Sequence, residues 1–434
     1  MHELYLKGFK HAITEAQPWT IMSAYNKVNT HYMSQHPTLL NPLLREQWGF
    51  EGAVITDWGA NDDRVAGLKA GQDVEMPGGL NHQITGIVKA VQNNELPLEI
   101  LNQRVLSILQ LIHKAVKGQQ SHHVNSDIEH HHALARRIAA EGIVLLKNDK
   151  QCLPLSKNIK IAVIGELAVK PRYQGSGSSL INPHKVISFH NALTQAQINF
   201  QYEPGYALHG DEVDPHLIHQ AILATQDKDA VICMVGLPDR YESEGFDRQH
   251  LNLPNAHIQL IEALCVHHAN VIVCLSNGAP IVMPWNTQPK AIVEAYLGGQ
   301  ASGEALMDVV FGDVNPSGKL AETFACDVNH HCSSQHFPGD AKQVQYREGL
   351  YVGYRWFTSA NIKPFILLVM DYHTVLLWYL ITPLLFIINI LRFKALFIIL
   401  HRWMEQKPYK CMLIIHNPYS FDLDYPSLDL KKYS

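Results

Sequence analysis

The sequence lacks the features that mark several classes of protein. Its 434 residues include seven cysteines, but no two have the CxxC spacing of a zinc site, and their scatter gives no disulfide framework. The 35 Lys and Arg are outnumbered by 40 Asp and Glu, so the net charge of −5 predicts no nucleic-acid partner. The first residues enter an amphipathic pattern without the apolar core of a signal peptide. These absences favour a reducing compartment, and we expect a cytoplasmic location.

Histidine, in contrast, is abundant. The chain has 26 histidines, and five of them lie close together at 122–123 and 130–132. Metal binding is one interpretation of this cluster. However, these histidines lie in a polar segment without a second group of ligands, so solvated surface is the favoured interpretation and no metal is expected.

Short apolar runs alternate with helical patterns over residues 1–118. The strands predicted from the apolar runs lie at 20–25, 53–56 and 73–76, and helices are predicted at 2–17, 37–48 and 64–70, with two more reaching about residue 117. This alternation with short connections is typical of a parallel α/β arrangement. Three strands are fewer than the eight of a closed barrel. We therefore expect an incomplete barrel or a smaller relative of one.

A second α/β unit is predicted over residues 156–364, after a polar linker at 119–155. Its buried strands are expected at 159–165, 230–235, 271–275 and 291–295, with helical stretches between them. This pattern predicts an open, mainly parallel sheet. The glycine-rich run 175–179 does not follow a strand directly and lacks the Lys-Ser/Thr of a phosphate loop, so it is a weak signal for phosphate binding.

Two carboxylates are placed where such folds carry their chemistry. Asp57 ends the apolar run 53–56 and is followed by Trp58, and in a parallel barrel the active site lies at the carboxyl ends of the strands. The alternative is that Asp57 caps the following helix. Glu244 is one of four acidic residues over 239–247. A solvated loop is the default interpretation of that segment, but its position after a predicted strand favours a ligand-facing loop.

A series of longer motifs runs through residues 2–364. They are MSAYNKVN at 22–29, LREQWGF at 44–50, TDWGA at 56–60, AGQDVEMP at 70–77, VLLKN at 144–148, LGGQASGEA at 297–305, NPSGKL at 315–320 and YREGLYVGYR at 346–355. Together these motifs resemble glycoside hydrolase family 3, the family of β-glucosidases and β-xylosidases.

The resemblance implies a fold and a set of roles. Residues 1–118 would be the C-terminal part of a (β/α)8 TIM barrel, and 156–364 an α/β sandwich domain. Asp57 would be the nucleophile and Glu244 the general acid/base. Residues implied to bind substrate are Tyr25, Met22, Trp58, Gly177, Ser178 and Ser179. The implied partner is a small oligosaccharide or an aryl or alkyl β-glycoside, with no cofactor.

The chemistry of retaining hydrolysis agrees with this assignment. It needs two carboxyl groups roughly 5–5.5 Å apart across the anomeric carbon. One must be ionised to attack and the other protonated to serve the leaving oxygen, so their surroundings must differ. An indole beside the nucleophile supplies an apolar face for a sugar ring.

The chain departs from the family pattern at its start. The family's barrel domain begins well before Met1, so we expect an N-terminally truncated chain. A complementing N-terminal fragment or a homo-oligomer is then an expected partner. A non-catalytic remnant or sugar-binding fragment stays open as an alternative to an active glycosidase.

A second departure follows residue 364, where FILLVMDYHT stands at 365–374 in place of the family's FGYGLSY and a fibronectin-like domain. If residues 366–374 are encoded by ATC CTT TTG GTT ATG GAC TAT CAT and a threonine codon beginning AC, the same bases read one position earlier spell PFGYGLSY after a Tyr or His. We therefore hypothesise a frameshift near 364–366, which would make 365–434 an aberrant tail, irregular or helical. Different codons in the gene would reject this. The apolar run 375–391 is otherwise a borderline membrane span, the less favoured interpretation.

Overall fold

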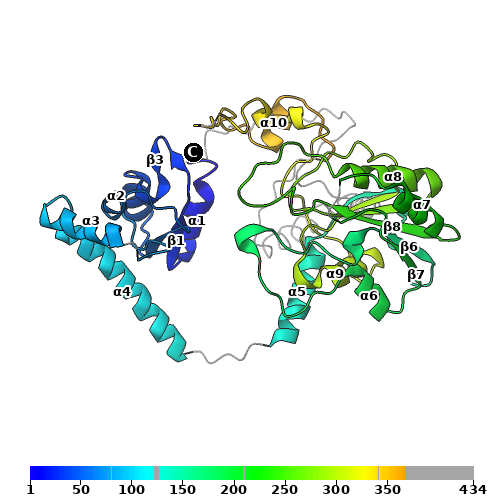
Figure 1. Cartoon of the computed structure of the whole chain (residues 1–434), viewed down its shortest axis with the longest axis horizontal. Coiled ribbons are helices and arrows are strands. Elements are labelled where there is room, and N and C mark those ends of the chain that lie inside the picture. Colours follow the sequence, from blue (N-terminus) through cyan, green and yellow to red (C-terminus); the bar gives the residue numbers. More distant parts are fainter. Residues whose placement is uncertain (80, 122–126, 209–210, 341, 367–434) are drawn as a thin grey trace, which may run out of the picture.

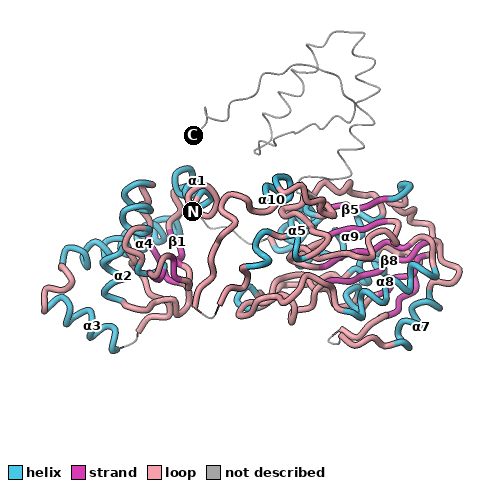
Figure 2. Tube along the Cα trace, turned by 90° about the horizontal axis from the view of Figure 1, so that it is seen from above, coloured by secondary structure: helices cyan, strands magenta, loops and turns pink. Residues whose placement is uncertain are grey.

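The protein folds into two units that lie side by side (Figures 1 and 2). The computed structural model describes residues 1–79, 81–121, 127–208, 211–340 and 342–366. The tail from residue 367, including the run 375–391 and nearly all of the hypothesised out-of-frame segment, lies outside these residues. Within the described part of the chain, no helix combines the length and apolarity needed to cross a bilayer.

The N-terminal unit has a short parallel sheet surrounded by helices. Its elements are α1 (Lys7–Ala16), β1 (Thr20–Ser23), β2 (Lys27–Val28), β3 (His31–Tyr32), η1 (Met33–Gln35), the π-helix η2 (Leu39–Gln47), β4 (Ala53–Thr56), α2 (Arg64–Ala70), α3 (Asn81–Gln92) and α4 (Leu98–Ser121). Strands β1 and β4 pair in parallel, and β2 and β3 form a hairpin. Apolar side chains of α1, η2 and β4 form the core of this unit.

The strand expected at 73–76 is reduced to one parallel bridge between Val74 and Ile55. Two side chains end the ladder on either side of Val74: the buried carboxylate of Asp73 accepts from the backbone N–H of Val54 (2.7 Å) and from Arg45 Nη2 (2.5 Å). The hydroxyl oxygen of Thr56 accepts from the backbone N–H of Met76 (2.8 Å). Burial raises the pKa of this carboxyl, although Arg45 and Arg104 oppose the shift. The backbone bonds that remain join the N–H of Val74 to the Val54 carbonyl (3.0 Å) and the N–H of Thr56 to the Val74 carbonyl (3.0 Å), so the predicted ladder is short.

The larger unit is an α/β sandwich around a six-stranded sheet. Its elements are α5 (Ile128–Gly142), β5 (Val144–Asn148), β6 (Ile161–Ile164), α6 (Phe189–Gln195), β7 (Phe200–Glu203), α7 (Pro215–Ala224), β8 (Ala230–Gly236), α8 (Asn255–His267), β9 (Val271–Ser276), β10 (Ala291–Glu294), α9 (Ser302–Val310) and α10 (Tyr354–Ser359). The strand order is β5-β10-β9-β8-β6-β7, parallel except for β5. Every residue of β6, β8, β9 and β10 is buried, because helices cover both faces of the sheet (Figure 1).

The sheet includes two strands that the sequence did not predict. Strand β5 lies inside the segment 119–155 expected as a linker, together with α5, and it forms one edge of the sheet. Strand β7 forms the other edge. Its residues FQYE are only partly buried, so they lack the continuous apolar run that identifies a central strand.

The expectation of solvated histidines was wrong for His132, which is only 6% exposed. Its Nε2 lies 2.6 Å from Glu304 Oε2, and its Nδ1 lies 2.8 Å from Gln300 Nε2. The ion pair between Arg136 and Asp308 joins the same two helices, α5 and α9. Because α5 packs against α9, the side of α5 carrying His132 is inside the unit. No three His, Cys, Asp or Glu side chains in the described parts of the chain are grouped to hold a metal ion.

Candidate active site

Asp57 lies at the carboxyl end of β4, half-buried between the two paired strands. Its backbone N–H donates to the carbonyl of Ser23 at the end of β1 (3.1 Å). The following helix α2 is capped by Asp63, whose side chain accepts from the N–H of Ala66 (3.0 Å). The alternative that Asp57 caps this helix was therefore wrong, and its carboxylate lies at the strand end instead.

Tyr25 and Trp58 hold the carboxylate of Asp57. Asp57 Oδ1 accepts hydrogen bonds from the Tyr25 hydroxyl (3.0 Å) and from the Trp58 backbone N–H (2.6 Å). The pKa of Tyr25 is raised, above all because its hydroxyl donates to this carboxylate. Both hydrogen bonds are made to the same oxygen, Oδ1, and together they fix the orientation of the carboxylate.

The two aromatic residues at this carboxylate, Tyr25 and Trp58, are exposed, as is Met22 on β1. The exposed fractions are 68% for Trp58, 62% for Met22 and 54% for Tyr25. Met22 is placed by β1, where it is the register partner of Ile55 on β4. Exposed aromatic and thioether side chains beside a carboxylate can cover the apolar face of a sugar ring.

Glu244 lies in the loop that follows β8, and it contacts the 177–179 segment. Its Oε2 accepts from the backbone N–H of Ser178 (2.7 Å), and its Oε1 accepts from the Ser178 hydroxyl (2.6 Å). These two donors lower the pKa of the Glu244 carboxyl. The nearby charge of Asp57 acts in the opposite direction. The charge of Asp57 therefore reaches the carboxyl group of Glu244, although the two side chains belong to different units.

Gly177 and Ser179 differ in their relation to Glu244. Gly177 has φ +87°, and a Cβ there would lie 2.5 Å from Glu244 Oε2, so any side chain would displace the carboxylate. The Ser179 hydroxyl donates to the carbonyl of Ser176 (3.5 Å), within its own turn. Of the predicted segment, Gly177 and Ser178 therefore lie against Glu244.

We expect the substitution Ser178→Ala to raise the pKa of Glu244 toward the ordinary glutamate range. It removes the hydroxyl donor that stabilises the carboxylate and keeps the backbone N–H. The measurement is a carbon-13 NMR titration of the glutamate carboxyls, with Ser179→Ala as the matched control, for which no shift is expected. Equal shifts in both variants would show that the hydroxyl of Ser178 does not set this pKa.

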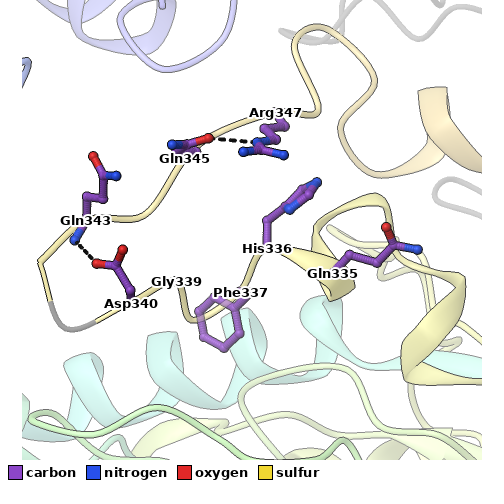
Figure 3. Close-up of a pocket in the computed structure, with 8 residues that line it drawn as sticks. All are labelled: Gln335, His336, Phe337, Gly339, Asp340, Gln343, Gln345 and Arg347. Carbon is purple, nitrogen blue, oxygen red and sulfur yellow. Dashed lines mark hydrogen bonds between the residues drawn. The ribbon is translucent and has the colours of Figure 1, made fainter.

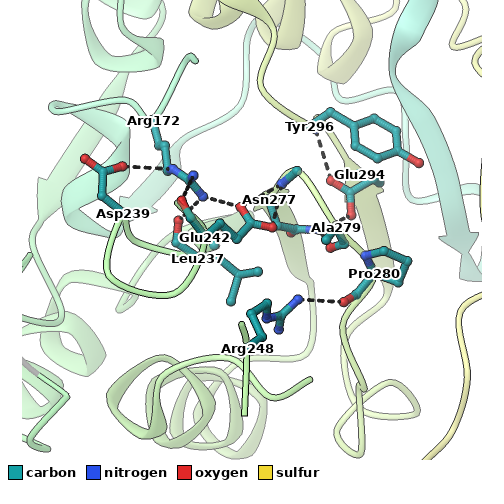
Figure 4. Close-up of polar contacts among 12 residues, drawn as sticks. Arg172, Leu237, Asp239, Glu242, Arg248, Asn277, Ala279, Pro280, Glu294 and Tyr296 are labelled. Atoms are coloured by element: carbon teal, nitrogen blue, oxygen red, sulfur yellow. Dashed lines mark hydrogen bonds and ion pairs between the residues drawn. The ribbon is translucent and has the colours of Figure 1, made fainter. Parts of the chain in front are cut away.

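Sequence reasoning missed a polar network next to Glu244 (Figure 4). Arg172 pairs with Glu242, and Asn277 Nδ2 donates to the buried carboxyl of Glu294 (2.9 Å). The acidic run 239–247 was the available signal. It could not distinguish the partly buried Glu242 from the exposed Glu244, because both lie in the same short polar loop.

Glu294 is expected to make the free energy of unfolding depend on pH. Burial raises its pKa from 4.5 to about 8. The unfolded chain loses this proton near pH 4.5 and the folded chain only near pH 8, so rising pH favours unfolding across that window. At about 1.4 kcal/mol per pH unit, the free energy of unfolding falls by on the order of 5 kcal/mol across this window. Chemical denaturation of Glu294→Gln at several pH values should give a flatter profile than the wild type. The exposed-site control Glu141→Gln should keep the wild-type slope, and a slope unchanged in Glu294→Gln would contradict the prediction.

A separate surface pocket lies near the end of the described chain (Figure 3). The residues that line it are Gln335, His336, Phe337, Gly339, Asp340, Gln343, Gln345 and Arg347. None of the predicted site residues is among them. A neighbouring residue, Tyr346, packs on Tyr5 of the N-terminal unit, with ring centroids 5.2 Å apart. Through Tyr346 this segment therefore contacts the N-terminal unit.

Comparison with known proteins assigns both units to one family. The family model described as the glycosyl hydrolase family 3 N terminal domain matches residues 1–111, and that of the C-terminal domain matches residues 143–354. The chain belongs to glycosyl hydrolase family 3. The resemblance inferred from the sequence is thereby confirmed, as is the α/β fold class with a partial TIM barrel and a mainly parallel sandwich sheet.

Named proteins and solved structures of this family are similar to the chain. It is 46% identical over 369 residues to thermostable beta-glucosidase B of Acetivibrio thermocellus, covering 84% of this chain and 48% of that protein. It is 41% identical to an exo-alpha-(1->6)-L-arabinopyranosidase of Bifidobacterium breve, covering 83% and 48%. The crystal structure of a family 3 beta-glucosidase from Bifidobacterium adolescentis matches with a TM-score of 0.81 at 39% identity, covering 85% of this chain and 54% of that one. The chain thus spans about half the length of these relatives.

Proposed function

We propose that this chain supplies the two carboxyl groups of a retaining glycosidase that releases terminal β-linked sugars, as a β-glucosidase does. One observation carries the proposal. Asp57, at a strand end of the N-terminal unit, and Glu244, on a loop of the sandwich, are close enough for the charge of one to shift the pKa of the other. A pair of carboxyl groups in different surroundings is what retaining hydrolysis requires.

In the first step Asp57 attacks the anomeric carbon, and the bond to the leaving oxygen breaks as Glu244 transfers its proton to that oxygen. A covalent glycosyl ester on Asp57 results. In the second step Glu244 takes a proton from water, which attacks the same carbon and releases the sugar and the Asp57 carboxylate. Tyr25 orients Asp57, and Trp58 contacts the sugar ring.

Glu244 must be protonated for the first step, whereas Ser178 favours its ionised form. Both oxygens of Glu244 are bonded to Ser178. We infer that substrate binding moves Glu244 from Ser178 to the leaving oxygen. The loss of two donors then raises its pKa, which suits a general acid.

The test is hydrolysis of 4-nitrophenyl β-glucoside by the purified chain, with Asp57→Asn as the matched inactive variant. The β-xyloside and the α-L-arabinopyranoside extend the test to other sugars, the latter because a relative is named for that substrate. Release of nitrophenol that Asp57→Asn abolishes supports the proposal. Equal inactivity of the two proteins rejects it for the isolated chain.

A second candidate is a sugar-binding fragment without activity. The exposure of Trp58, Met22 and Tyr25 favours it, because a catalytic pocket usually encloses its sugar. Glucose should then change the tryptophan fluorescence of the wild type and leave Trp58→Phe unaffected. Assembly with a second copy or with a complementing fragment stays a prediction, which light scattering with and without the other polypeptide tests.

A further inference from the structure

Three loops meet at the carboxyl ends of the central strands of the sandwich sheet, and Glu244 lies on one of them. Strand β8 is paired with β6 on one side and with β9 on the other, all in parallel, and Gly236 is the register partner of Ser276. The loops that leave the carboxyl ends of these strands therefore emerge together. They carry Arg172 after β6 and Glu242 after β8 (Figure 4), and Gly278 after β9.

Arg172 holds the loop after β8 at several points. Its side chain is only 5% exposed. Nη1 donates to the carbonyl of Leu237 (2.6 Å) and pairs with the Glu242 carboxylate, while Nη2 donates to the carbonyl of Glu242 (3.0 Å). Nε donates to the carboxylate of Asp239 (3.1 Å). One guanidinium thus binds both ends of the segment 237–242.

Glu242 ties the same loop to the turn after β9. Its side chain is 12% exposed, and the backbone N–H of Gly278 lies 3.1 Å from Oε1 and 2.9 Å from Oε2. A Cβ on Gly278 would lie 3.3 Å from Leu297 Cδ1 and 3.5 Å from Glu242 Oε2, so the turn is closely packed there. The carboxylate of Glu242, largely shielded from solvent, has the guanidinium on one side and the N–H of Gly278 on the other, so its charge is satisfied on both sides.

We propose that Arg172 and Glu242 are positioning residues that set the place of Glu244. Two residues of extended chain span at most about 7 Å, so fixing Glu242 limits where Glu244 can lie. Arg172 is also six residues before Ser178, in the same loop. The pair therefore joins the segment that bonds to Glu244 with the segment that carries it. The inference rests on the proposed acid/base role of Glu244.

The kinetic test uses Glu242→Gln, which keeps the shape of the side chain and an oxygen for Gly278 but removes the charge that pairs with Arg172. We expect kcat for an alkyl β-glucoside to fall about 100-fold, since small misplacements of a reacting group have effects of that size, while KM changes little. Arg172→Lys should act in the same direction, because a lysine cannot make the same set of directed bonds. The matched control is Lys157→Gln, which breaks an exposed ion pair with Asp313 outside these loops and should leave kcat unchanged.

A double-mutant comparison separates positioning from general damage to the fold. If Glu242 acts through Glu244, the substitution Glu242→Gln should cause no further loss of kcat in a Glu244→Ala background. An equal loss in both backgrounds would overturn the inference.

A measurement that needs no activity separates this inference from the proposed function. Glu242→Gln should raise the pKa of Glu244, as Ser178→Ala does, because a displaced Glu244 loses the Ser178 donors. The carbon-13 NMR titration gives this result even if the isolated chain hydrolyses nothing. An unchanged pKa of Glu244 in Glu242→Gln would overturn the positioning role, whereas an inactive wild type with a shifted pKa would reject only the proposed function.

Discussion

Replacing Asp57 by glycine is expected to lower kcat/KM for aryl β-glucosides by about four to six orders of magnitude, the range seen when a covalent nucleophile is removed. The ester intermediate cannot form without this carboxylate. The fold should persist, because Asp57 is half-buried and α2 has its own cap in Asp63.

Azide provides the positive result that identifies a nucleophile. In the space left by Asp57→Gly, azide can attack the anomeric carbon itself while Glu244 protonates the leaving oxygen. The expected product from a β-glucoside is the α-glucosyl azide, which proton NMR identifies from the coupling of the anomeric proton. The control is Asp62→Gly, on the same loop, which should keep wild-type activity and form no azide adduct. A β-glucosyl azide or no rescue would contradict the assignment of Asp57.

Replacing Glu244 by alanine is expected to affect substrates according to their leaving groups. A 2,4-dinitrophenolate leaves without a proton, so kcat/KM for its β-glucoside should fall less than about 10-fold. An alkyl alcohol needs the proton, so its glycoside should lose about 10²–10⁴-fold, the usual contribution of general acid catalysis. Measuring kcat/KM over a series of aryl and alkyl glucosides gives the dependence directly, because this ratio reports the first irreversible step.

The matched control for this series is Glu212→Ala, which removes an exposed glutamate of the same unit. Its kcat/KM should be unchanged for every leaving group. If Glu244→Ala lost the same factor for dinitrophenyl and alkyl glucosides, Glu244 would not be the proton donor, and the role of its Ser178 contact would need another explanation.

The part of the fold that the sequence predicted is the part with strong local patterns. The central strands β6, β8, β9 and β10 were predicted because a strand covered on both faces is a continuous apolar run. The edge strands β5 and β7 were missed because a half-covered edge needs no such run. The predicted strand at 73–76 became one bridge, since the side chains of Asp73 and Thr56 accept backbone N–H groups on either side of the Val74 pairing.

In the candidate site, too, the residues that the sequence predicted are those with a local sequence pattern. Asp57 at a strand end, Trp58 beside it and Glu244 after β8 could all be named from short motifs, because each lies next to the element that places it. What the sequence determined by itself is therefore the family, the central strands and the two candidate carboxyl groups.

Only the tertiary structure decided which groups surround those carboxyls. Arg172 and Glu242 are 70 residues apart, and His132 and Glu304 are 172 apart, so no local pattern could pair them. Glu294 ends a strand as Asp57 does, yet it is fully buried and Asp57 is not. The order of strands in a sheet decides which loops meet. Hydrogen bonds from one such loop lower the pKa of Glu244, whereas burial raises the pKa of Glu294.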